Sequence, residues 1–65
     1  MMTDKKRDEI VNNVLIPYRD MLHENDRAAK AFLAMGIVFY GAKNILQVVD
    51  FFGVYDLPIV DGKVV

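Results

Sequence analysis

The sequence predicts an all-α fold, a two-helix hairpin followed by a short extended C-terminal tail, and three observations lead to this prediction. Apolar side chains recur at a helical period over residues 4–23, a long apolar stretch fills residues 26–52, and an Asp-Gly pair near the end indicates a tight turn. A chain of 65 residues is one domain at most, and folding at this size buries only about 60% of the surface that the unfolded chain exposes. We therefore expect a single small helical unit over residues 1–65.

Residues 4–23 predict an amphipathic first helix. Thr3 is a suitable N-cap, and Asp4 in the first turn is favourable near the positive end of the helix dipole. Pro17 has no N–H and its ring crowds the carbonyl of Asn13, so we expect a kink there. The apolar arc keeps its phase across Pro17 and contains Ile10, Val11, Val14, Leu15, Tyr18, Met21 and Leu22.

Residues 26–52 predict one long apolar helix. Asn25 or Asp26 can accept the first free N–H groups, and Gly53 is suited to end the helix because glycine adopts left-handed geometry without strain. Residues 31–42 are apolar nearly all round the helix. The second half is amphipathic, with polar side chains within roughly 120° of one another. This polar stripe consists of Lys43, Asn44, Gln47 and Asp50.

The tail over residues 53–65 is expected to be extended. Pro58 disfavours a continued helix, and Asp61-Gly62 between two short apolar segments is a type I′ hairpin signal. A hairpin with three-residue arms is not stable alone in water. The tail therefore either packs against the helices or is flexible.

The composition argues against an enzyme. The chain has no Cys and no Ser, a single Thr3 and a single His23, so a nucleophile paired with a base is not available. The spacing of Asp20, His23 and Glu24 is that of half a helix-bundle metal site, but a solvated polar face explains it equally well. We expect no catalytic, cofactor or metal site and no small-molecule substrate. The net charge of −1 also disfavours nucleic-acid binding.

Length and charge permit a membrane span. Residues 31–49 would form a helix of about 28 Å, close to the hydrocarbon thickness. Six Lys and Arg residues precede residue 31 and only Lys63 follows residue 49, which favours a cytoplasmic amino terminus, and no secretory signal peptide is visible. Nine strongly apolar residues contribute roughly −3 to −5 kcal/mol to insertion, whereas Lys43 alone costs up to about 3 kcal/mol. Insertion is therefore marginal unless the polar stripe faces a partner.

Two hypotheses of function follow. The first is a small single-pass membrane protein that acts as an oligomeric subunit, in one version holin-like, or as an accessory structural subunit. The alternative is a soluble helical-hairpin interaction module, located in the cytoplasm, that buries its apolar helix in a homo-oligomer or a larger protein assembly. In both, the residues expected to face a partner or another copy are Ile10, Val14, Tyr18, Met21, Gly36, Lys43, Asn44, Gln47 and Asp50.

Overall fold

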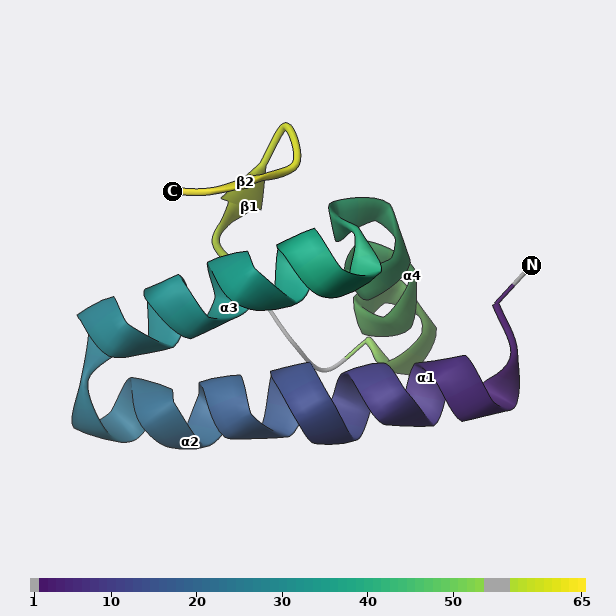
Figure 1. The fold of residues 1–65 in the computed structure, drawn as a ribbon, viewed down its shortest axis with the longest axis horizontal. Helices are drawn as coiled ribbons and strands as arrows, with labels where there is room; N and C mark the ends of the chain where they lie inside the picture. The colour runs from purple at the N-terminus through teal and green to yellow at the C-terminus, as the bar shows by residue number, and fades with distance from the viewer. Residues whose placement is uncertain (1, 54–56) are drawn as a thin grey trace.

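The computed structural model describes residues 2–53 and 57–65, which are mostly helical and end in a short antiparallel pair of strands. Three helical rods follow one another along the chain (Figure 1): a long first rod, a second that runs back beside it, and a third that crosses their end. The elements are α1 (Asp4–Ile10), η1 (Val11–Leu15), α2 (Ile16–Glu24), α3 (Asp26–Tyr40), α4 (Ala42–Phe52), β1 (Ile59–Val60) and β2 (Lys63–Val64).

The elements α1, η1 and α2 form the first rod, which agrees with the helix predicted over residues 4–23 and extends it to Glu24. The Thr3 hydroxyl accepts the amide N–H of Lys6 at 3.1 Å, which confirms the predicted N-cap. Near Pro17, where we expect a kink, the rod contains a π-helical turn just before the proline, in which the Ile16 N–H donates to the carbonyl of Val11. In Figure 1 the rod continues beyond this turn in the same general direction.

The single helix expected over residues 26–52 is wrong, because the chain turns sharply at Gly41. The helix α3 ends at Tyr40, α4 begins at Ala42, and their axes differ by 107°. Gly41 has φ +88° and ψ 135°, a conformation that residues with a Cβ rarely adopt, so the corner requires glycine. The Asn44 side-chain amide donates to the Tyr40 carbonyl at 2.7 Å and satisfies one of the free carbonyls that the corner leaves.

The other predicted helix ends are confirmed. Asn25 accepts the N–H of Ala28 at 3.1 Å through its side-chain oxygen, and Gly53 closes α4 in the left-handed conformation with φ +65°. Within the described residues no single helix is both long and apolar enough to cross a membrane. Only α3 and α4 taken together, bent as they are, pass that test of length and composition.

The core lies where the three rods meet. One close approach in it joins α3 to the first rod at Gly36, where an added Cβ would lie 2.8 Å from Val14 Cγ1. Gly36 therefore lets the two helices approach more closely than a larger residue would allow. The fully or nearly fully buried apolar side chains are Ile10, Val14, Leu15, Tyr18, Ala29, Leu33, Ile45 and Val48.

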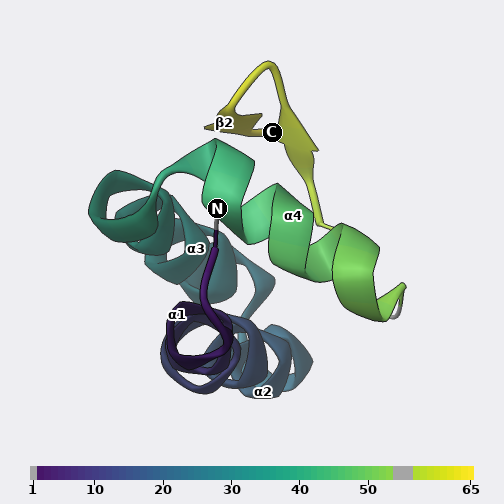
Figure 2. The ribbon, with the colours of Figure 1, turned by 90° about the vertical axis from the view of Figure 1, so that its right-hand side faces the viewer.

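The tail forms the hairpin that its Asp-Gly pair predicts. Ile59 pairs with Val64 and Val60 with Lys63, and both turn residues have positive φ, 54° at Asp61 and 80° at Gly62, as a type I′ turn needs. Side chains of the hairpin and of Leu57 pack against the core, which supplies the support that short arms lack. Figure 2 shows the hairpin beside α4, on the side away from α1 and α2. Residues 54–56 of the predicted tail lie outside the described residues.

Candidate interaction surface

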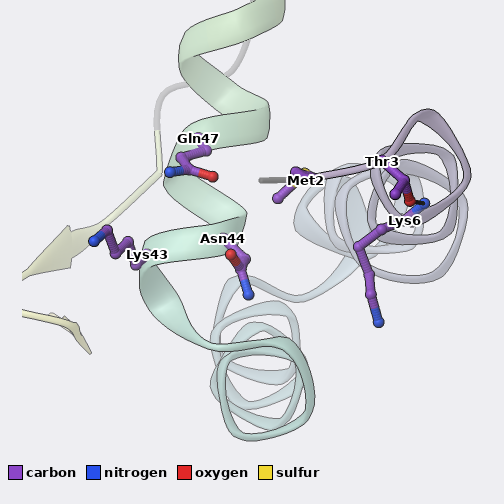
Figure 3. A pocket seen from close by; sticks show the side chains of 6 residues that line it. All are labelled: Met2, Thr3, Lys6, Lys43, Asn44 and Gln47. Atoms are coloured by element: carbon purple, nitrogen blue, oxygen red, sulfur yellow. Dashed lines mark hydrogen bonds between the residues drawn. The ribbon is translucent and has the colours of Figure 1, made fainter.

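The polar stripe predicted on the second helix lies on α4, and all four of its side chains are exposed. Lys43, Asn44 and Gln47 line an open cleft of about 400 Å³, whereas Asp50 is not among its lining residues. The opposite wall comes from the start of the first rod and consists of Met2, Thr3 and Lys6. Figure 3 shows Lys43 projecting away from Lys6, and the Asn44 amide nitrogen pointing toward the corner and not toward Met2.

The chemistry of this cleft is mostly structural. The Asn44 amide already donates to the Tyr40 carbonyl, and the Thr3 hydroxyl already caps α1. The two lysine side chains diverge, so they do not converge on one anion (Figure 3). Among the described residues no group of three or more His, Cys, Asp and Glu side chains is placed to hold a metal ion. The cleft therefore has no pre-organised ligand site.

Five of the residues predicted to face a partner, four on the first helix and Gly36 on α3, are buried or half-buried within the chain. Ile10, Val14 and Tyr18 are at most 5% exposed, and Gly36 is buried against Val14. Met21 is half-buried and packs against the core. Within the chain, these five residues are thus covered wholly or in part by packing between the helices.

Apolar side chains are instead exposed on the outside of α3. The inner side of this helix joins the core through Ala29 and Leu33, whereas Met35, Val38 and Phe39 are 63%, 86% and 83% exposed. The sequence indicated this feature, since residues 31–42 are apolar all round and the core takes up only one side of a helix.

A groove runs along this exposed side, between α3 and the first rod. Its volume is about 250 Å³, and the side chains of Phe32, Met35 and Phe39 form its α3 wall. Val14 and Gly36 also line it, at the point where the two helices are closest. Together with Asn13 and Tyr40, these residues define what we call the α3 groove.

Polar groups mark one edge of the α3 groove. The Asn13 side-chain amide donates to the Tyr40 hydroxyl at 3.1 Å, which ties the first rod to the end of α3. The ammonium group of Lys6 lies 5.4 Å from the centre of the Tyr40 ring, a cation–π distance. The edge is thus held in place by the chain itself, and the groove beside it remains apolar.

No described element covers the α3 groove. Figure 2 shows α4 and the hairpin on one side of the pair formed by the first rod and α3, and no ribbon over the opposite side. Our sequence analysis missed Phe32, Met35 and Phe39 as surface residues, because it assigned the free side of the apolar helix to lipid or to a general partner.

On the other side of the helix pair, Tyr18 lines a pocket together with Asp26 and Lys30. Burial raises the pKa of its phenol, the charge of Asp26 raises it further, and Lys30 partly offsets both effects. The side chain is 5% exposed and belongs to the core. We therefore assign Tyr18 a structural role.

Comparison of this chain with models of protein families, with curated proteins and with solved structures finds no match. The function must therefore be argued from the surface of the chain.

Proposed function

We propose that the chain is a small helical interaction module, which joins a homo-oligomer or larger assembly through the α3 groove and the adjoining outer side of α3. The observation that carries this proposal is the exposure of Val38 and Phe39, 86% and 83%, in a chain whose core is complete without them. A neighbouring pair of large apolar side chains held so far into solvent is typical of interaction sites.

The size of the surface indicates what a partner must do. Met35, Val38 and Phe39 expose on the order of 400 Å² together, so their burial contributes about 10 kcal/mol at about 25 cal/mol/Å². Association costs roughly 4–15 kcal/mol in lost freedom of motion. These three side chains alone therefore do not give a tight complex. The partner must also fill the groove beside them.

Site-specific photo-crosslinking in the producing cell tests the proposal. A photoreactive phenylalanine analogue is placed at position 35 or 39, and at Val60 as a control, because Val60 is 56% exposed but lies on the hairpin. We expect a discrete crosslinked product from positions 35 and 39 and none of the same mass from position 60. Absence of a product at both α3 positions, or the same product at all three, would contradict the proposal.

A second candidate is a membrane-associated accessory or hole-forming subunit with a cytoplasmic amino terminus. It is favoured by one observation, that α3 and α4 together have the length and composition of a bent membrane segment. The outer side of α3 would then contact lipid, and the polar stripe of α4 would face water or protein. Fractionation of the untagged chain followed by an alkaline carbonate wash tests this candidate. Retention in the washed membrane pellet supports it, and complete release contradicts it.

A further inference from the structure

We infer that the occupant of the α3 groove is a second copy of this chain, packed so that the first rod and α3 of each copy form a four-helix bundle. This inference rests on the proposed function, since it assumes that the groove is an interaction surface. It adds the identity of the partner.

The arrangement of layers is the first argument. The first rod and α3 form a two-helix layer, and α4 with the hairpin covers one side of it (Figure 2). Helical layers are stable when both apolar sides are covered, and two such hairpins cover each other in a four-helix bundle. The uncovered side is apolar at Phe32, Met35 and Phe39, as the inner side of a bundle requires.

The size of the layer is the second argument. The 15 residues of α3 make a helix about 22 Å long, and two adjacent helices are about 20 Å wide. A face of about 22 by 20 Å has the scale of the smaller specific interfaces, which bury about 600 Å² on each partner. A second layer of the same dimensions therefore matches this surface without a large overhang.

Sedimentation equilibrium of the purified full chain, without detergent or lipid, tests the inference. We expect a dimer, and we expect the double variant M35K/F39K to raise the dissociation constant at least about a hundredfold, because two charges then lie in the apolar interface. Both replaced side chains are exposed, so the monomer should stay folded. The matched control V60K/V65K makes the same charge change at exposed apolar residues of the tail and should leave the dimer unchanged. Circular dichroism confirms that each variant is helical.

Each outcome decides between the proposals. A monomer at about 100 μM, combined with a crosslink from position 39 to a protein of another mass, overturns the second copy but leaves the interaction module intact. The absence of any crosslink from the α3 positions contradicts both. A monomer that associates only with lipid vesicles overturns the second copy in favour of the membrane candidate. A dimer insensitive to M35K/F39K places the interface elsewhere and overturns the inference.

Discussion

The close approach of α3 to the first rod depends on Gly36, and replacing it by alanine should destabilise the fold. The added Cβ would lie 2.8 Å from Val14 Cγ1 and 3.1 Å from Val14 Cγ2. Val14 is 2% exposed, and a valine in a helix has essentially one rotamer, so its methyl groups cannot swing away. The helices must therefore move apart, or the side chain must strain.

The magnitude is the difference between two effects. Alanine stabilises the interior of a helix by about 1 kcal/mol relative to glycine. Overpacking a well-filled core costs about 1–3 kcal/mol. We expect G36A to lower the free energy of unfolding by about 1–2 kcal/mol, because the steric contact is with a stiff side chain. Ala34 of the same helix is exposed, so A34G gives the helix-propensity effect alone, a loss of about 1 kcal/mol.

Urea unfolding followed by circular dichroism measures these differences in the free energy of unfolding. Repeating it at several protein concentrations separates them from any contribution of association. V14A alone should cost about 2 kcal/mol, for two lost methyl groups and the space they leave. In the double variant G36A/V14A the new methyl group occupies part of that space, so the two changes should interact favourably by at least about 1 kcal/mol. A stabilised G36A, or strict additivity in the double variant, would refute the steric reasoning.

Three further predictions concern the corner and the core. G41A should lower the free energy of unfolding by about 1–3 kcal/mol in urea titration, because φ +88° is strained for alanine, and a gain in stability would contradict the corner. R7A should cost about 1 kcal/mol in the same assay, mostly through the stacking of its half-buried guanidinium 4.4 Å from the Phe51 ring centre. Loss of its ion pair with the exposed Asp4 should contribute little, and an unchanged midpoint would argue against the stacking. Because the pKa of Tyr18 is raised in the fold, its contribution to stability is present below about pH 10 and is lost as the pH rises through the folded pKa. Y18F should therefore flatten the loss of stability above about pH 10, and an identical alkaline profile for both proteins would show that another group causes it.

Local signals in the sequence predicted the ends of the helices well. Thr3, Asn25 and Gly53 cap their helices as expected, and the Asp61-Gly62 pair forms its turn. Each of these features depends on the conformation of one or two residues and on hydrogen bonds within a few positions, so composition and spacing suffice to predict them.

The corner at Gly41 was not predicted, because glycine inside an apolar helical pattern is compatible with both a straight helix and a turn. Glycine costs a helix only about 1 kcal/mol relative to alanine, which many packing arrangements can offset. Whether the chain turns at Gly41 depends on the apolar surface that α4 buries after the turn, and in this structure Ile45 and Val48 are fully buried there. Such a gain depends on residues far away in the sequence, so the local pattern does not contain it.

The corner also explains why the polar and apolar candidates for the site separate in space. In one straight helix, the polar stripe and the apolar side chains of residues 31–42 would follow each other along a single axis. The turn of 107° places the stripe on α4, across the end of the helix pair, and leaves Met35 and Phe39 on the open side of the layer. Lys43, which makes membrane insertion costly, therefore does not belong to the apolar surface that we propose for contact with a partner. The polar stripe, which in the sequence argued for a partner, thus stabilises the corner through Asn44, and the partner surface that we propose is the apolar one.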